Sequence, residues 1–213
     1  MYAFLSKIHI EMKLIAITTP TFFVEEDQII TALFEEGLDI LHLRKPETPP
    51  MYSERLLTLI PQKYHKRIVV HDHFYLQEEF GLMGIHLSER NPNEPHDYSG
   101  HLTSSCQSLD EVKVKKRFYD YVILYPVFNG ISPSFMPAGF TLDELKTAEK
   151  SHIIDSHVMA LGGVCEENIR TIKKLGFGGA VLMGDLWGRF DVHQNRDYQG
   201  IIQHFIKLKK LVD

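Results

Sequence analysis

The chain has 213 residues, of which 44% are hydrophobic and 24% charged, and its formal net charge is −5. This composition is typical of a globular protein, and the absence of a basic stripe argues against a nucleic-acid partner. No apolar run approaches the roughly 20 residues of a membrane span, so we expect no membrane association. Two cysteines, Cys106 and Cys165, are too few for a disulfide framework, which favours a reducing, cytoplasmic environment.

Short apolar runs alternate with helical segments along the chain. Residues 1–11 lack periodicity and are expected to be an N-terminal extension, with Met12 as an alternative start. In chain order, the runs that predict strands are residues 12–20, 40–44, 67–72, 84–88, 101–105, 121–125, 158–161 and 180–183. The segments that predict helices are residues 25–37, 53–62, a short one through 79, one from 108, 141–150, 166–175 and 199–211. Residues 89–100 are polar and proline-rich, which predicts a loop or a degenerate helix.

This alternation of eight strands with helices favours a single α/β domain over residues 1–213, folded as a (β/α)₈ TIM barrel. A doubly wound sheet is the less favoured arrangement. The apolar outer helices leave room for a homodimer, although no specific patch argues for one.

Glycines follow the last two predicted strands, at Gly162, Gly163 and Gly184. Glycine lets backbone N–H groups approach an anion, and the loops after the last two strands of such barrels often form a phosphate site. The alternative is that these glycines only make tight turns.

Polar residues also follow the other strands, and in such barrels the chemistry lies at these strand ends. They are Thr18, Thr19, His42, Arg44, Lys45, His71, Asp72, His86, Glu89, Asn91, Ser104, Ser105, Asn129 and Ser132. Arg44 is suited to grip phosphate oxygens bidentately, with Lys45 as a further charge. Asp72 is a candidate ligand for Mg²⁺, which prefers one or two carboxylates plus phosphate and water.

Each assignment has a structural alternative. In the alternative for Arg44 and Lys45, the two side chains are simply solvated at the end of a strand. Asp72 would cap the following helix. His86 would be a hydrogen-bonded histidine inside the barrel, because it points opposite to its apolar neighbours. Cys106 and Cys165 would be small packing residues rather than functional thiols.

The chain from Met12 to Trp187 resembles the family of thiamine-phosphate synthases and thiazole tautomerases. The matching segments, in order, are His42-Leu43-Arg44, Val70-His71-Asp72, Gly84-Ile85-His86-Leu87, Ser104 to Glu111, Tyr121 to Phe128, and Ala160-Leu161-Gly162-Gly163-Val164. The resemblance implies a transferase of thiamine biosynthesis. It couples hydroxymethylpyrimidine diphosphate with thiazole phosphate and releases pyrophosphate, with Mg²⁺ as cofactor.

Site roles follow from the same resemblance. Arg44, Ser105 and His71 would be catalytic, with Arg44 on the diphosphate and Ser105 on the departing group, and Asp72 and Asn91 would hold the metal. The residues that would bind the phosphorylated heterocycles are His42, Arg44, Lys45, His71, Ser105, Ser132, Gly162, Gly163, Met183 and Gly184.

The chain also departs from the family pattern. The second metal-binding Asp is Asn91, and the strand-two lysine position is Pro46, with Lys45 displaced by one residue. After strand six, Gly130-Ile131-Ser132-Pro133 replaces the synthase Thr-x-Thr-Lys. The histidine of bacterial tautomerases is Pro126, so His42, His71 or His86 would have to serve as its base.

Four hypotheses remain. The chain is a synthase with an altered diphosphate site, which is the favoured one, or a thiazole tautomerase that needs no cofactor. In the third hypothesis the chain is an inactive barrel that binds thiazole or thiamine phosphate. In the fourth it is an unrelated phosphate-sugar isomerase, with a metal centre built by His42, His71, Asp72 and His86.

Overall fold

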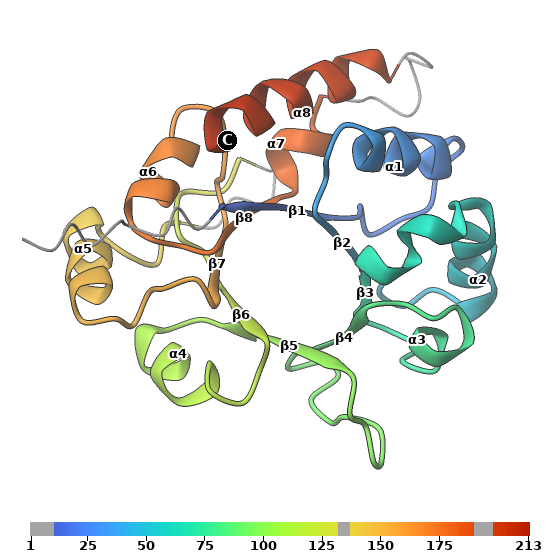
Figure 1. The fold of residues 1–213 in the computed structure, drawn as a ribbon, viewed down its shortest axis with the longest axis horizontal. Helices are drawn as coiled ribbons and strands as arrows, with labels where there is room; N and C mark the ends of the chain where they lie inside the picture. The colour runs from blue at the N-terminus through green and yellow to red at the C-terminus, as the bar shows by residue number, and fades with distance from the viewer. Residues whose placement is uncertain (1–10, 132–136, 190–197) are drawn as a thin grey trace, which may run out of the picture.

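The computed structural model describes residues 11–131, 137–189 and 198–213. Eight parallel strands close into a barrel in the order β1 to β8, which confirms the predicted fold (Figure 1). The strands are β1 (Lys13–Ile17), β2 (Ile40–Leu43), β3 (Ile68–Val70), β4 (Gly84–Leu87), β5 (His101–Cys106), β6 (Tyr121–Leu124), β7 (Val158–Leu161) and β8 (Gly179–Leu182). Pairing of Leu14 with Ala180 closes the ring between β1 and β8.

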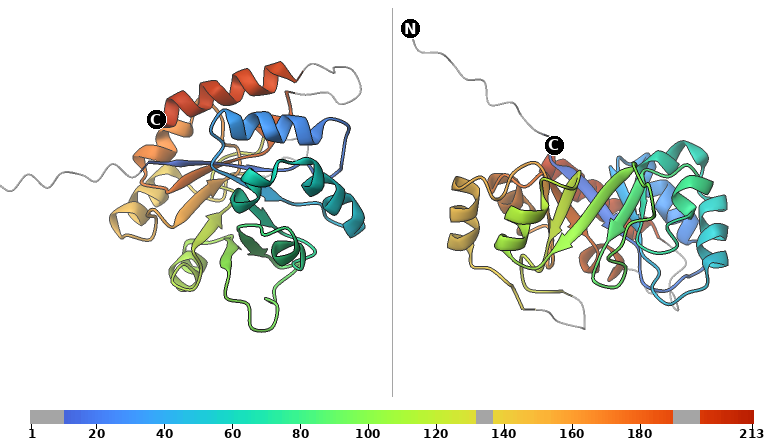
Figure 2. Two further views of the ribbon diagram at one scale, coloured as in Figure 1. Left: turned by 45° about the vertical axis from the view of Figure 1, so that its right-hand side comes forward. Right: turned by 90° about the horizontal axis from the view of Figure 1, so that it is seen from below.

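Helices surround the barrel, as the views along and across its axis show (Figures 1 and 2). They are α1 (Glu26–Glu35), α2 (Pro50–Leu59), α3 (Leu76–Glu79), α4 (Leu109–Lys115), α5 (Leu142–Lys150), α6 (Ile169–Lys174), α7 (Gly184–Trp187) and α8 (Gln199–Val212), with a 3₁₀ helix η1 at Gln62–Arg67. Residues 89–100 contain no helix, so of the two predicted alternatives the loop is correct. None of the helices in the described ranges has the length and apolar character needed to cross a membrane.

The predicted boundaries were wrong in places. β1 ends at Ile17 rather than at Pro20, and α2 begins three residues earlier than expected, with Pro50 in its first turn. A proline suits that position because the first helical N–H has no intrahelical partner. The helices η1 and α7 were not predicted, since segments of four to six residues carry too little periodicity to be recognised.

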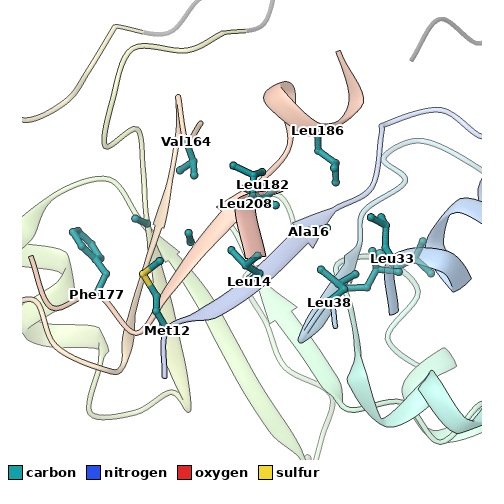
Figure 3. Close-up of a cluster of buried hydrophobic side chains, with 14 of the residues drawn as sticks. Met12, Leu14, Ala16, Leu33, Leu38, Val164, Phe177, Leu182, Leu186 and Leu208 are labelled. Atoms are coloured by element: carbon teal, nitrogen blue, oxygen red, sulfur yellow. The ribbon is translucent and has the colours of Figure 1, made fainter. Parts of the chain in front are cut away.

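Alternating residues of each strand face two separate apolar layers. Leu14 of β1 and Leu182 of β8 pack outward with helix residues such as Leu208 (Figure 3). Ile15 of β1 and Val181 of β8 belong to the second cluster, which fills the barrel. The period of two in a strand therefore places every second side chain inside the barrel, where polar groups can be displayed at the carboxyl ends.

Candidate active site

A cavity of about 600 Å³ opens at the carboxyl ends of the strands. That volume lies within the range of roughly 300–1,000 Å³ that is usual for small-molecule sites. Its lining residues are Ile17, Arg44, His71, His86, Ser88, Glu89, Arg90, Ser105, Ile123, Tyr125, Pro126, Gly130, Ile131, Leu161, Gly162, Gly163, Val164, Val181, Met183, Gly184 and Asp185. Seven of the residues predicted for the site line it, namely Arg44, His71, Ser105, Gly162, Gly163, Met183 and Gly184.

A cluster of buried imidazoles forms the floor of the cavity. His42 Nδ1 is hydrogen-bonded to His71 Nε2 at 2.8 Å, and His42 Nε2 is hydrogen-bonded to the Tyr121 hydroxyl at 2.6 Å. His42 is fully buried and lies below the cavity, whereas His71 lines it. Strands β2 and β6 bring His42 and Tyr121 together because both side chains point into the closed barrel.

His86 completes this cluster from β4. Its Nδ1 is hydrogen-bonded to Thr103 Oγ1 and its Nε2 to Ser105 Oγ, both at 2.8 Å. The prediction of a hydrogen-bonded histidine inside the barrel is therefore confirmed. His86 also holds Ser105, a predicted catalytic residue, at the cavity wall.

These imidazoles are held in the neutral state. Burial, together with the positive charges of Arg44 and Lys115, lowers the pKa of His86 to about 3. Burial also holds the pKa of His42 and His71 well below the ordinary value. A neutral imidazole donates a hydrogen bond through one ring nitrogen and accepts one through the other, so the neutral rings make the hydrogen bonds of this cluster at neutral pH.

The same histidines are the one group of three potential metal ligands in the described part of the chain, with ligand atoms within 4.8 Å of one another. Two observations argue against a metal at this position. Both nitrogens of His42 and of His86 already have hydrogen-bond partners. The rings of His71 and His86 are also stacked, with an interplanar angle of 19°, so their in-plane lone pairs do not converge on one point.

Arg44 presents a cation to the cavity. Its backbone is fixed by Thr18, whose hydroxyl accepts from Arg44 N and donates to Arg44 O, both at 3.0 Å. No described residue forms a hydrogen bond or ion pair with its guanidinium. This group is therefore available for an anionic ligand.

Lys45, which was predicted to bind the substrate, does not line the cavity. Its ammonium is buried, 2.5 Å from Glu26 Oε1 and 4.3 Å from the centre of the Phe22 ring. Burial lowers the pKa of Lys45 and raises that of Glu26 to about 7, against the attraction between them. Lys45 thus packs against α1, because the residue after Arg44 points to the other side of the chain.

The predicted metal ligands Asp72 and Asn91 are adjacent but do not line the cavity. Asp72 Oδ1 lies 2.7 Å from Nη1 of Arg90 and 3.3 Å from Asn91 Nδ2. Asp72 does not cap the following helix, because α3 begins only at Leu76. Arg90 was not identified from the sequence, since it belongs to a polar loop without a recognisable pattern.

The glycine turns after β7 and β8 also line the cavity. Gly162 and Gly163 have positive φ angles of 104° and 61°. A Cβ at Gly163 would lie 2.0 Å from the carbonyl oxygen of Asn129, so the turn also requires glycine for its close approach to the loop after β6. Within the described residues, no acceptor takes a hydrogen bond from the backbone N–H of Gly163 or Gly184. These amides are suited to bind phosphate oxygens.

Two further placements complete the comparison with the sequence. Asp185, which was not predicted, lines the cavity and is held by His204 at 2.5 Å and by Arg189 at 3.1 Å. No sequence signal pairs residues of α7 and α8. Ser132 falls outside the described residues.

Known proteins share both the sequence pattern and the fold. The family model described as "TMP-TENI: Thiamine monophosphate synthase" matches residues 14–186. A crystal structure of a thiamine phosphate pyrophosphorylase from Bacteroides thetaiotaomicron is 65% identical, with a TM-score of 0.86, and the match covers 94% of this chain and 97% of that chain. A thiamine phosphate pyrophosphorylase from Pyrococcus furiosus is 20% identical with a TM-score of 0.72, over 96% of each chain, and supports the fold alone.

Curated relatives give the same result at lower identity. A thiamine-phosphate synthase from Caldicellulosiruptor saccharolyticus is 24% identical over 196 residues, which is 87% of this chain and 82% of the relative. One from Alkaliphilus oremlandii is 21% identical over 174 residues, which is 74% of this chain and 78% of the relative.

Proposed function

Because this chain belongs to the thiamine monophosphate synthase family, we propose that it is a thiamine-phosphate synthase, a transferase of thiamine biosynthesis. It joins hydroxymethylpyrimidine diphosphate to thiazole phosphate. The bond between the pyrimidine methylene and the diphosphate oxygen breaks, pyrophosphate leaves with the electron pair, and the thiazole nitrogen forms the new bond to the methylene carbon.

The observation that carries this proposal is the presence of two kinds of anion-binding group in one cavity. Arg44 supplies a guanidinium that no described residue pairs, and the turns at Gly162, Gly163, Met183 and Gly184 supply backbone amides. Two phosphorylated heterocycles fit such an arrangement, with the diphosphate at Arg44 and the single phosphate at the glycine turns. Charge on the departing diphosphate is then stabilised by groups fixed before the reaction begins.

Ser105 and His71 line the same cavity. Thr103 Oγ1 donates to the Ile85 carbonyl and accepts from His86 Nδ1, so His86 Nε2 accepts from the Ser105 hydroxyl. Ser105 therefore donates to the departing diphosphate only by turning away from His86. His71 is neutral and buried, so it fills the cavity floor without neutralising the substrate's charge. His42 supports His71 from below rather than touching the substrate.

The family resemblance implies Mg²⁺ at Asp72 and Asn91, but these residues do not fit the ion. Arg90 and the Asn91 amide both point N–H groups at Asp72 Oδ1. The orientation of the Asn91 amide is fixed, because its nitrogen also donates to the His71 carbonyl at 2.9 Å, and a carbonyl oxygen only accepts. One carboxylate that is already bonded to donors is a poor ligand for Mg²⁺, which requires oxygen donors in near-octahedral geometry.

A coupling assay tests the proposed function. The purified chain is incubated with hydroxymethylpyrimidine diphosphate and thiazole phosphate, once with Mg²⁺ and once with EDTA. Thiamine phosphate and pyrophosphate are then quantified in each reaction. We expect equal amounts of the two products, and a large loss of rate in Arg44→Ala. Binding of both substrates without any product would show an inactive barrel instead.

A second candidate function is thiazole tautomerisation, which one observation favours. The neutral imidazole of His71 lines the cavity, and only its Nε2 is hydrogen-bonded to a described residue, so Nδ1 can move a proton on a bound thiazole phosphate. The assay is therefore repeated with the thiazole tautomer alone. Isomerisation that is lost in His71→Asn but kept in Arg44→Ala would identify the tautomerase.

A further inference from the structure

Arg90 occupies the position at which the family resemblance implies a metal ion. Its Nη1 lies 2.7 Å from Asp72 Oδ1, in an ion pair whose side chains are 36% and 12% exposed. Arg90 lines the cavity, whereas Asp72 lies behind it. The guanidinium therefore stands between the carboxylate and the space in which a ligand would bind.

The backbone holds Arg90 at this place. Ser88 N donates to Asn91 O and Asn91 N donates to Ser88 O, both at 3.1 Å, so residues 88–91 form a turn closed from both ends. The Asn91 side chain ties the turn to β3 through the His71 carbonyl. Arg90 lies inside this turn, and its side chain is aligned by Asp72 rather than being free in solvent.

The side chains of Arg90 and Arg44 both line the same cavity of about 600 Å³. Two guanidinium groups on the wall of one such cavity can serve one multiply charged anion. A guanidinium has five N–H donors, so Arg90 can bond to Asp72 and still present donors to phosphate oxygens.

The local charge is also consistent with this exchange. A divalent cation between two carboxylates has no net charge, and neither has a guanidinium beside one carboxylate and one amide. The replacement of a carboxylate by Asn91 removes one negative charge, and a guanidinium carries one positive charge fewer than Mg²⁺. Both arrangements thus have the same net charge.

We propose that Arg90, aligned by Asp72 and Asn91, replaces the divalent cation at this site and binds the diphosphate together with Arg44, so that this chain binds diphosphate without Mg²⁺. This inference rests on the proposed function for the identity of the anion. Its structural part, a metal-independent diphosphate site, is tested separately from turnover.

Calorimetric titration with inorganic pyrophosphate in EDTA is the first test. We expect the unaltered chain to bind, and Arg90→Gln to bind about 10- to 100-fold more weakly, as for loss of one charge-assisted contact. Arg90→Lys should fall between them, because an ammonium keeps the charge without the planar donor geometry. Arg117→Gln is the matched control, because Arg117 stacks on Phe118 in the segment between α4 and β6, at the opposite end of the barrel, and should bind as the unaltered chain does.

Binding of Mn²⁺, followed by electron paramagnetic resonance in the presence of pyrophosphate, is the second test. We expect no site on the unaltered chain and a new site on the double variant Arg90→Gln, Asn91→Asp. Pyrophosphate binding that requires a divalent ion, unaltered affinity in Arg90→Gln, a Mn²⁺ site on the unaltered chain, or none on the double variant would each overturn the inference.

The coupling assay separates this inference from the proposed function. Pyrophosphate binding through Arg90 without formation of thiamine phosphate would refute the synthase function and leave the metal-free site intact. Coupling that occurs only with Mg²⁺ and is unchanged in Arg90→Gln would support the synthase and refute the role of Arg90.

Discussion

Acid should unfold this protein through its buried imidazoles. The folded-state pKa values of His42, His71 and His86 all lie below the ordinary value of 6.5, that of His86 at about 3. A group whose pKa is lowered by folding contributes stability that is present above its unfolded pKa and is lost as the pH falls. The free energy of unfolding should therefore decrease below pH 6.5, because the unfolded chain takes up protons that the folded chain excludes.

The magnitude follows from the number of protons. Between pH 6.5 and 5, each histidine that stays neutral in the folded chain lowers the free energy of unfolding by about 2 kcal/mol. The reason is that each proton taken up only by the unfolded chain changes stability by about 1.4 kcal/mol per pH unit. Glu26 acts in the opposite direction, because its pKa is raised to about 7 and its protonation on acidification relieves its buried charge. The net loss for three histidines and one glutamate is about 4 kcal/mol, a large part of a typical stability of roughly 5–15 kcal/mol.

Urea unfolding at pH 8, 6.5, 5.5 and 5 measures this dependence. The double variant His42→Gln, His71→Asn keeps polar side chains but removes two titrating groups, so it should lose about 4 kcal/mol less than the unaltered chain between pH 8 and 5. Replacement of the exposed His96 by Asn is the control and should leave the pH dependence unchanged. Equal pH dependence in the double variant and the unaltered chain would refute the assignment of these imidazoles as neutral.

Three further substitutions test the placement of the site. Arg44→Gln should weaken pyrophosphate binding at least about tenfold, as measured by calorimetry. It should change the free energy of unfolding by no more than about 0.5 kcal/mol in urea unfolding. A loss of stability as large as the loss of binding free energy would show that Arg44 has a structural role. Gly163→Ala should lower stability by at least about 2 kcal/mol, because the new Cβ would lie 2.0 Å from Asn129 O at a positive φ, and an unchanged melting temperature would contradict the strained turn. Lys45→Met should cost about 3–5 kcal/mol at pH 8 by leaving Glu26 buried without a cation, and addition of Glu26→Gln should restore most of it. Weakened phosphate binding at unchanged stability would instead place Lys45 in the substrate site.

The sequence alone determined the barrel and the candidates at its rim. Strand positions are local information, because a run such as Val158–Leu161 must be buried on both sides and glycines must end it. Their alternation with helices then admits few arrangements. The period of two in a strand also placed His86 inside the barrel before any tertiary contact was known.

Only the tertiary structure decided how the rim residues are used. The alternation of side chains places Arg44 and Lys45 on opposite sides of the chain, but only the packing of α1 against this segment pairs Lys45 with Glu26 and leaves Arg44 in the cavity. The pairing of Asp72 with Arg90 joins residues of two different loops, and the contact of His42 with Tyr121 crosses the closed barrel. Such contacts depend on the relative placement of distant segments, which no local pattern of residues records.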